Sequence, residues 1–478
     1  MKPVIAGPTE AVAGSAQQMP AARLALASLS LSMLLSSLGI SIANVGLPTL
    51  AQAFDASFQD VQWVVIAYLL AITTLIVSVG RLGDLMGRRR LLLAGIFLFT
   101  LASALCGLAP SLELLIAARA LQGLGAAIML ALTMAFVGET VAKAKTGSAI
   151  GLLGSMSAIG TALGPSLGGV LIAGFGWQAI FLISVPLGAL ALLLARLYLP
   201  ADRQTPKAER GGFDPLGTLL LALTLAAYAL AMTMGRGLDM ALLLVAGVGI
   251  GLFVWVEARV ASPLIRLALF RDPLLSGSLA MSALVSTVMM ATLVVGPFYL
   301  SDGLGLDAAR VGLTLAVGPF VAALTATPAG RIADRFGAQR MTIVGLVGMA
   351  AACLLLALLP ERLGIGCYIA PLVVLTMGYA LFQTANNTAV MADVPANQRG
   401  VIAGMLNLSR NLGLITGASA MGAVFVFASA TRDITTAHPQ AVASGMRVTF
   451  AVALALVATA LAIALASRAL ARRMGRVA

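Results

Sequence analysis

Long apolar runs alternate with short polar segments along almost the whole chain. A helix needs about 20 apolar residues to cross a bilayer, and it satisfies its backbone hydrogen bonds internally. The pattern therefore predicts an all-α membrane protein with about fourteen transmembrane helices. The predicted spans cover residues 24–43, 61–79, 91–109, 114–137, 149–174, 179–198, 216–234, 241–256, 279–300, 313–329, 341–359, 367–391, 401–427 and 448–466.

A polar, glycine-rich segment separates the second and third predicted spans, and a similar segment separates the tenth and eleventh. Residues 80–90 read GRLGDLMGRRR and residues 330–340 read GRIADRFGAQR. The copies share the order Gly, Arg, Asp, Gly at a separation far longer than the period of a solenoid repeat. The duplicated segment indicates a duplicated domain.

The glycines of the fifth and thirteenth spans extend this repeat at one constant offset. Gly147, Gly151, Gly160 and Gly164 match Gly400, Gly404, Gly413 and Gly417. Two homologous six-helix bundles with two inserted helices between them are therefore predicted, in the manner of transporters built from parallel repeats. The expected division is a tail at 1–23, a bundle at 24–200, a cytoplasmic linker at 201–215, an inserted pair at 216–260, a bundle at 261–468 and a basic tail at 469–478.

Composition supports a membrane protein and argues against a nucleic-acid partner. The chain is 60% hydrophobic and 10% charged, with a mean hydropathy of +1.02, and a soluble globule of this size carries more charge. The net charge of +12 arises because Lys and Arg gather on the side of the N-terminus, as they do in cytoplasmic loops. We expect both termini to lie in the cytoplasm and the protein to lie in the inner (cytoplasmic) membrane.

The sequence indicates neither a metal site nor a bound cofactor. Cys106, Cys353 and Cys367 lie in or beside apolar runs without CxxC spacing, which is typical of packed core residues. His438 stands alone in a polar loop. Because no GxxxxGK[ST] phosphate loop occurs, we expect a proton gradient rather than ATP as the energy source.

Three short motifs follow one another in the N-terminal half. They are residues 80–90, residues 114–123 (LLIAARALQG) and residues 160–169 (GTALGPSLGG). In this order they resemble the signature between helices two and three, the helix-four arginine motif and the helix-five antiporter motif of the major facilitator superfamily. The resemblance is to its fourteen-spanner drug:proton antiporter branch. Weaker matches at 44–48 and 177–186 extend it over nearly the whole chain.

The resemblance implies a conformational latch in the duplicated segment. Asp84 would face the N-terminus of helix thirteen near Gly400, and Asp334 would face that of helix five near Gly147. The positive end of a helix dipole stabilises a carboxylate. The alternative is a basic loop that sets topology and carries an incidental Asp. The predicted latch residues are Gly80, Asp84, Gly87, Arg88, Gly330, Asp334 and Gly337.

Two arginines lie within predicted spans, where a charge is costly unless it faces a cavity or a polar partner. Arg119 is the leading functional candidate, because it would order a polar network or modulate a proton site. The alternative is a side chain that snorkels to the headgroups. Arg410 is a similar case. Neutral polar residues that would line the same cavity, or else bond helices together, are Asn44, Gln122, Gln383, Asn386 and Asn387.

Gly160, Gly164 and Gly168 repeat every fourth residue and so form one flat helix face. Such a face allows a partner helix to approach closely, and Pro165 can bend the helix. With Gly169, these residues form the motif that resembles exporters. The motif predicts either a close-packed pivot or ordinary helix packing.

The chain departs from the family pattern in helix one, where Gly39 stands at the position that usually carries Asp. All 18 acidic residues lie in predicted loops or at helix ends. Because a cation without a carboxylate partner is costly in a membrane cavity, we expect neutral, amphipathic, zwitterionic or anionic substrates. The candidate proton carriers are Asp84, Glu113, Glu139, Glu257 and Asp334.

These features favour a monomeric secondary transporter that exports small amphipathic molecules by proton antiport with alternating access. The first alternative is an uptake symporter or facilitator for a metabolite, which Gly164 and Pro165 argue against. The second is a membrane enzyme that acts on lipid-linked substrates. Such an enzyme needs clustered acids or histidines, whereas the outer loops hold scattered residues such as Asp55, Asp60 and Glu361. We therefore expect no enzymatic activity.

Overall fold

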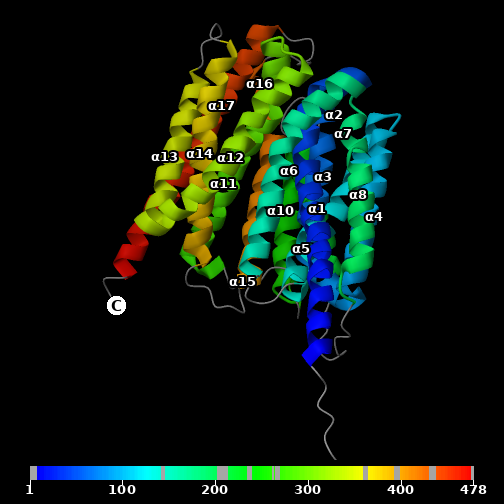
Figure 1. The fold of residues 1–478 in the computed structure, drawn as a ribbon. Coiled ribbons are helices and arrows are strands. Elements are labelled where there is room, and N and C mark those ends of the chain that lie inside the picture. The colour runs from blue at the N-terminus through cyan, green and yellow to red at the C-terminus, as the bar shows by residue number, and fades with distance from the viewer. Residues whose placement is uncertain are drawn as a thin grey trace, which may run out of the picture.

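The computed structural model of the chain is all-helical throughout the part that it describes (Figure 1). The described residues are 8–140, 146–201, 214–233, 239–260, 263, 270–358, 364–391, 399–429 and 438–474. The first half holds α1 (Pro8–Phe54), α2 (Phe58–Val61), α3 (Trp63–Met86), α4 (Arg88–Gly107), α5 (Leu112–Thr140), α6 (Thr146–Phe175), α7 (Ala179–Leu182) and α8 (Ser184–Tyr198).

Two further helices, α9 (Pro215–Thr233) and α10 (Met240–Glu257), lead to the second half. That half holds α11 (Pro273–Phe298), η4 (Tyr299–Gly303), α12 (Ala308–Phe336), α13 (Ala338–Ala357), α14 (Gly364–Met391), α15 (Arg399–Thr416), η5 (Gly417–Met421), α16 (Gly422–Ala428) and α17 (Pro439–Met474). The elements η4 and η5 are single π-helical turns.

Within the described residues, 12 helices are long and apolar enough to cross a membrane. The fifth and seventh predicted spans coincide with α6 and α9, whose apolar parts, Ile159–Phe175 and Pro215–Ala231, are shorter. The prediction of an all-helical membrane protein is confirmed, whereas the predicted number of fourteen spans is not.

The duplicated polar segment is largely helical rather than a loop. α3 continues to Met86 and α12 continues to Phe336, and one glycine then separates each from the next helix. Gly87 has φ 93° and Gly337 has φ 91°, a backbone region that glycine enters at little cost. The same turn therefore joins two helices in each half of the chain.

The helices of the two halves pair in the same pattern. α1 packs against α6 and α8, while α3 and α4 each pack against α5. Correspondingly, α11 packs against α15 and α17, while α12 and α13 each pack against α14. We call these two groups the N bundle and the C bundle, and they lie side by side (Figure 1).

The bundles contact one another through α6 with α12, α3 with α15, and α1 with α11. We call the end that carries α2 and α16 the α2 end, and the opposite end, where α1 begins, the tail end (Figure 1). At the α2 end, the ring centroid of Phe58 lies 4.6 Å from that of Phe298 and 5.5 Å from that of Phe425. Phe58 belongs to the N-terminal half and the other two rings to the C bundle.

The buried apolar core is shared between the bundles at the α2 end. One cluster of described side chains joins the α2-end half of the N bundle, including Leu47 and Phe58, to the C bundle. A second cluster occupies the tail-end half of the N bundle, including Leu29 and Phe136, and has no member from the C bundle. The described cores are therefore continuous across the molecule at one end.

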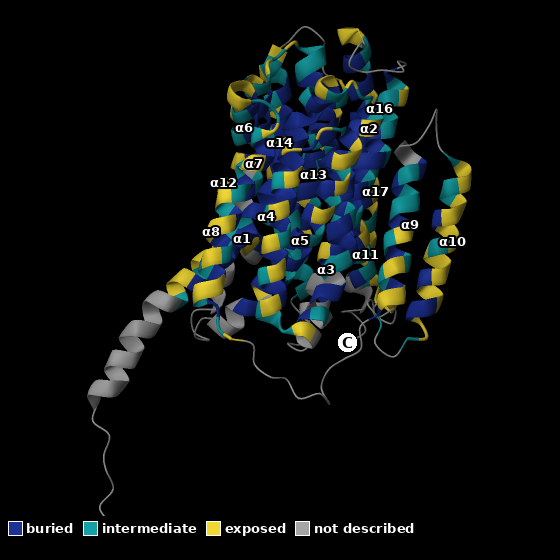
Figure 2. Cartoon of the chain, turned by 90° about the vertical axis from the view of Figure 1, so that its right-hand side faces the viewer, coloured by how far each residue is buried: buried dark blue, intermediate teal, exposed yellow. Residues whose placement is uncertain are grey.

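The inserted pair, α9 and α10, lies at the edge of the molecule (Figure 2). α9 contacts α3 of the N bundle, and also η5 and α16 of the C bundle. The hydroxyls of Ser78 on α3 and Thr218 on α9 lie 2.8 Å apart, and the Tyr228 side chain of α9 lies near Thr416 of α15. α9 thus touches both bundles.

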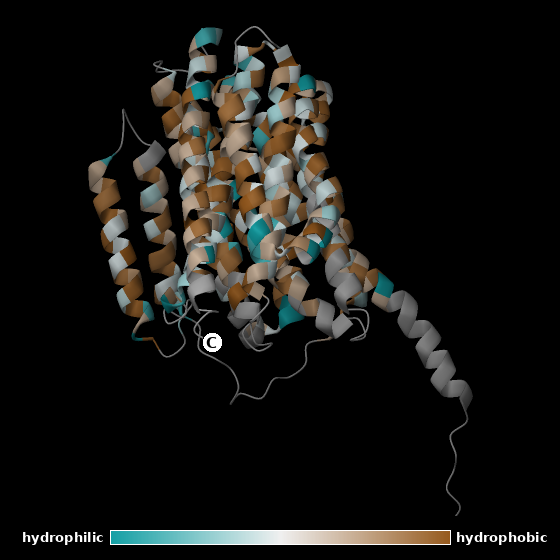
Figure 3. Cartoon of the chain, turned by 90° about the vertical axis from the view of Figure 1, so that its left-hand side faces the viewer, coloured by the Kyte–Doolittle hydropathy of each residue, from teal (hydrophilic) through white to brown (hydrophobic). Residues whose placement is uncertain are grey.

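The surface of the inserted pair is largely apolar (Figure 3). A groove of about 370 Å³ between α9 and α10 is lined by apolar side chains and Thr224. Exposed apolar residues on α10 include Leu244, Val248 and Trp255. Such a surface is expected where a helix meets lipid tails.

Candidate functional site

The duplicated segment keeps its glycine geometry, but the proposed latch falls largely outside the described side chains. Asp84 and Asp334 belong to the last turns of α3 and α12. Their side chains, and that of Arg399 at the start of α15, lie outside the described part of the structure. Gly80 and Gly330 lie within the same two helices and Arg88 begins α4. The latch stays a prediction.

Arg119 lies within the N bundle with 0% of its surface exposed. Its Nε donates a hydrogen bond to the Val64 carbonyl at 2.8 Å, and its Nη2 donates to the Gly39 carbonyl at 3.0 Å. Its Nη1 donates to Gln122 Oε1 at 2.5 Å, and Gln122 Nε2 donates to Ser103 Oγ at 2.7 Å. Arg119 and Gln122 together connect α5 to α1, α3 and α4.

The ring of Tyr68 supports the same guanidinium. Its centroid lies 4.1 Å from Arg119 Cζ, a cation–π arrangement that stabilises a desolvated cation. The Tyr68 hydroxyl donates to the Ser36 carbonyl at 2.9 Å. A Cβ atom placed on Gly39 would lie 2.8 Å from this hydroxyl. Tyr68 therefore fills the space that a side chain at position 39 would need.

The structure thus shows how the N bundle holds Arg119 without an acid in helix one. Within the described residues, no carboxylate forms an ion pair with Arg119, and carbonyl oxygens satisfy its donors instead. Asn44 is 1% exposed and donates to the Ile40 carbonyl at 2.9 Å. Neither residue is open to a substrate in this conformation, so their predicted role in a cavity remains untested.

The polar residues predicted on helix twelve lie on α14. Asn386 is buried and its Nδ2 donates to the Ser278 carbonyl of α11 at 3.3 Å. Gln383 and Asn387 are half-buried. Their side-chain oxygens are shielded from solvent and accept no hydrogen bond from the described residues. Asn386 joins two helices, whereas its two neighbours keep free acceptors.

Arg410 lies on α15, and two asparagines share its helix face. Asn407, Arg410 and Asn411 follow the spacing i, i+3, i+4, which places them on one side of a helix. Asn407 is exposed, and the other two are half-buried. Ser409, on the opposite side, is buried and donates to the Leu279 carbonyl of α11. We call Asn407, Arg410 and Asn411 the polar face of α15.

The sequence prediction named Arg410 and missed Asn407 and Asn411. A lone asparagine in an apolar run carries little signal, because asparagine often bonds helices together. The spacing around Arg410 was the available signal. The orientation of α15 was needed to show that the three side chains lie opposite the packed face.

The antiporter motif on α6 has two packed faces. Cβ atoms added to Gly160, Gly164 or Gly168 would collide with α1, so this stripe lies within the N bundle. Gly169 faces Gly312 of α12 instead, and a Cβ on either glycine would collide with the backbone of the other helix. Only one side of the motif therefore contacts the C bundle.

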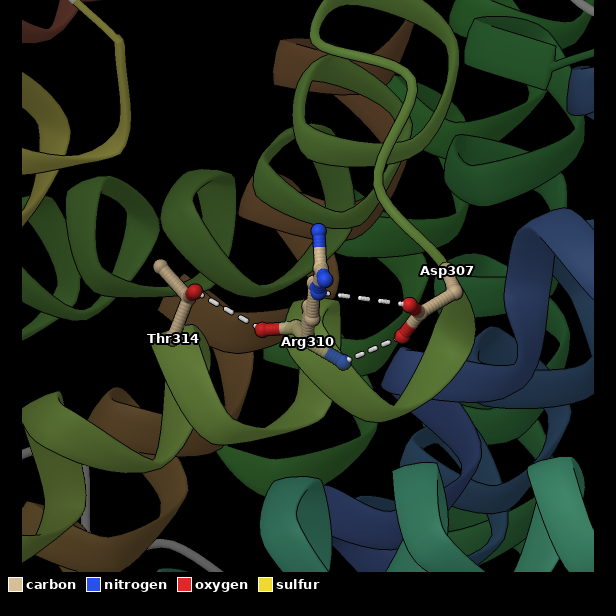
Figure 4. A network of polar contacts seen from close by, with 3 residues as sticks. All are labelled: Asp307, Arg310 and Thr314. Atoms are coloured by element: carbon tan, nitrogen blue, oxygen red, sulfur yellow. Dashed lines mark hydrogen bonds and ion pairs between the residues drawn. The ribbon is translucent and has the colours of Figure 1, made fainter.

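The start of α12, near this crossing, is held by a local polar network (Figure 4). Asp307 Oδ1 accepts a hydrogen bond from the Arg310 backbone nitrogen at 2.8 Å. The Arg310 Nε lies 3.4 Å from Asp307 Oδ2, and Thr314 Oγ1 donates to the Arg310 carbonyl at 2.7 Å. Both charged side chains are exposed, so this pair is a helix cap rather than a transport site.

Charge is distributed unevenly in the described spans. Their carboxylates, Asp60, Glu113, Glu257 and Asp302, lie within three residues of a span end. Arg119 and Arg410 lie well inside spans, and Arg447 lies two turns into α17. The described carboxylates therefore lie near the span ends, whereas Arg119 and Arg410 lie farther inside.

The sequence pattern of the family described as Major Facilitator Superfamily matches residues 29–418. Multidrug resistance protein Stp of Mycobacterium tuberculosis is 33% identical over 390 residues, which cover 80% of this chain and 72% of that protein. Riboflavin transporter RibZ of Clostridioides difficile is 29% identical over 391 residues, which cover 82% of this chain and 85% of that protein.

Among solved structures, the chain is similar to a bacterial homologue of the human lysosomal transporter Spinster in an inward-facing and occupied conformation. The TM-score is 0.70 at 16% sequence identity, and the match covers 93% of this chain and 96% of that chain. At this identity the likeness concerns the fold alone.

Proposed function

The chain belongs to the Major Facilitator Superfamily, and on that premise we propose that it exports small amphipathic molecules across the cytoplasmic membrane by proton antiport. Family membership makes it a multi-pass membrane transporter of small molecules rather than an enzyme. Export, proton coupling and the substrate class are the proposed part.

The core arrangement supports transport by alternating access. The described apolar core runs across both bundles at the α2 end, whereas the tail-end half of the N bundle has a core of its own. Two rigid bundles joined at one end can exchange that contact for one at the other end. Lys and Arg are concentrated in the segments predicted on the same side of the membrane as the N-terminus. Such segments are cytoplasmic, so the tail end is the cytoplasmic side.

Two findings support export. The relative Stp is named as a multidrug resistance protein. The chain also keeps the Gly-Pro-x-x-Gly-Gly sequence at 164–169, with glycine packing on both faces of α6. Small residues allow the close helix approach that a rocking interface needs.

A second candidate function is transport of a flavin-like metabolite. It is favoured by the match to a relative named as a riboflavin transporter over most of both chains. A facilitator or symporter of this kind would move its substrate down a concentration gradient, or together with protons.

Inverted membrane vesicles with an imposed pH gradient, acidic inside, distinguish these functions. We expect time-dependent accumulation of an amphipathic dye that a protonophore abolishes. Entry of riboflavin only to equilibrium, unaffected by the protonophore, would favour a facilitator, and loss of preloaded riboflavin driven by the pH gradient would favour a symporter. Asp84→Asn should lower the rate of dye accumulation if the latch exists, and unchanged transport in this variant would remove the latch from the mechanism.

A further inference from the structure

The polar face of α15 lies inside a membrane span. Asn407, Arg410 and Asn411 fall within the apolar segment Met405–Ala428. The opposite side of the helix packs against α11 through Ser409, and α15 also contacts α3 of the other bundle. Charged and amide side chains in a span face a water-filled path rather than lipid. The polar face therefore lines the passage between the bundles.

The amides of α14 lie at the same depth. Asn386 bonds the carbonyl of Ser278, and Ser409 bonds the carbonyl of the next residue, Leu279. The helices α14 and α15 thus contact α11 at the same level along its axis. With a rise of 1.5 Å per residue, this level lies about 9 Å from Pro273, the first residue of α11. Gln383 and Asn387 keep unpartnered, shielded oxygens close to this level.

Hydroxyl groups of α11 lie beside its contact with α15, where Ser286 faces Gly413 on the side of α15 opposite the polar face. Ser282 and Ser286 follow Ser278 at one-turn intervals and are 1% exposed. Their Oγ atoms have no partner among the described residues. Buried polar atoms without partners are uncommon in finished protein interiors, but the Ser286 hydroxyl belongs to the packed contact between α11 and α15 and not to the polar face.

Arg410 supplies the charge of this zone. The donors of Arg119 bind carbonyls and Gln122, and its surface is fully buried. Arg410 is half-buried, and its Nε makes no hydrogen bond to the described residues. Because the described spans hold no interior carboxylate, the negative charge that a desolvated guanidinium favours is brought by the transported molecule.

We propose that the polar face of α15, together with Gln383 and Asn387, binds the acidic group of an amphipathic organic anion such as an aromatic carboxylate. This rests on the proposed function as a transporter of amphipathic molecules and assigns its substrate charge. Arg410 bonds the anionic oxygens, and the neighbouring amides bond the rest of the polar end.

Binding of a matched probe pair to the purified protein tests the assignment. The probes are a dansyl-labelled amino acid with a free carboxylate and its methyl ester. Measurements in vesicles of phosphatidylcholine alone, and in vesicles with added phosphatidylglycerol, separate a soluble anion from a lipid headgroup. We expect the acid to bind at least about tenfold more tightly than the ester, since a charge-assisted bond contributes about 1.4 kcal/mol or more.

Arg410→Gln should remove the preference for the acid while leaving ester binding within about twofold, and Arg410→Lys should keep part of it. Arg310→Gln, which alters an exposed arginine at the opposite end, is the matched control and should keep the wild-type preference. Equal binding of acid and ester by the wild type overturns the proposal, even if the Arg410 variants do not fold. Equal weakening of both probes in Arg410→Gln overturns it as well.

Two further outcomes are decisive. If added phosphatidylglycerol abolishes acid binding in the wild type, Arg410 serves lipid headgroups and the proposal fails. Failure of the exporter function is distinguishable, because it appears as absence of gradient-driven accumulation of every dye. Failure of the present inference appears as export of neutral or cationic dyes without binding of the acid.

Discussion

At the residue scale, Arg119 shows how one buried cation is accommodated. Two helix carbonyls, one amide and the rings of Tyr68 and Phe181 surround it. A charge in a span is costly unless such groups replace its hydration. Three neighbouring helices are bonded to α5 in this way, so Arg119 stabilises the packing of four helices of the N bundle.

Arg119→Ala should therefore destabilise the folded protein. The change removes hydrogen bonds from a charged donor, each of which contributes about 1.5–3 kcal/mol, and it leaves a cavity beneath Tyr68. We expect a melting temperature several degrees lower in detergent, measured by intrinsic fluorescence. Arg310→Ala, at an exposed arginine, is the control and should melt within a degree or so of the wild type. Equal melting of all three proteins would contradict a structural role for Arg119.

Sequence reasoning found Arg119 and Arg410 because a charge in an apolar run stands out. It could not find the partners of Arg119, since backbone carbonyls carry no sequence signal. It also missed Asn407 and Asn411, because an amide becomes informative only when its helix face is known. The glycines at 160, 164 and 168 were recognised as a packing stripe. The sequence did not identify α1 as the helix that they contact.

At the element scale, α9 is the helix that touches both bundles. It bonds α3 through Thr218 and Ser78 toward the tail end, and it reaches Thr416 of α15 through Tyr228. If the bundles rock against one another, α9 cannot keep both attachments. The direct hydroxyl pair and the broader contact with α3 favour movement of α9 with the N bundle.

Disulfide cross-linking tests this prediction. Ser78→Cys with Thr218→Cys should cross-link on oxidation, because hydroxyls 2.8 Å apart bring the Cβ atoms near disulfide range, and transport should continue. Tyr228→Cys with Thr416→Cys should block transport until a reductant is added. Each single-cysteine variant is the control for oxidation of the native thiols. The reverse pattern would assign α9 to the C bundle.

The apolar runs predicted where the helices lie, whereas they did not predict the helix ends or the π turns. Residues 80–86 and 330–336 were expected between spans but continue α3 and α12, since Gly87 and Gly337 alone make the turns. The π turns η4 and η5 depend on local hydrogen bonding that hydropathy does not record. Within the described residues, 12 helices are long and apolar enough to cross a membrane, and the apolar parts of α6 and α9 are shorter than these.

At the scale of the whole molecule, the crossing of Gly169 and Gly312 holds α6 against α12. A Cβ on Gly312 would collide with the Pro165 carbonyl and with Gly169 Cα. Because these atoms are backbone, they cannot move aside as a flexible side chain would. The contact therefore depends on the absence of a side chain at both positions.

Gly312→Leu should separate the bundles near the α2 end and shift the conformational equilibrium. We expect faster alkylation of a cysteine introduced at Phe425, which is fully buried in the aromatic cluster with Phe58. Gly247→Leu is the matched control, because no atom lies within 4 Å of a Cβ at this position on α10. An unchanged alkylation rate in Gly312→Leu would mean that the crossing does not control this end.

The carbonyl ligands of Arg119 have a consequence for energy coupling. A carboxylate partner could take up a proton and release the arginine, but an amide carbonyl stays unprotonated at every pH at which the protein is folded. The bonds to Gly39 and Val64 are therefore the same on both sides of a pH gradient. If protons drive the proposed cycle, we expect them to act near the membrane surfaces, where the carboxylates of the described spans lie, and not at the centre of the N bundle.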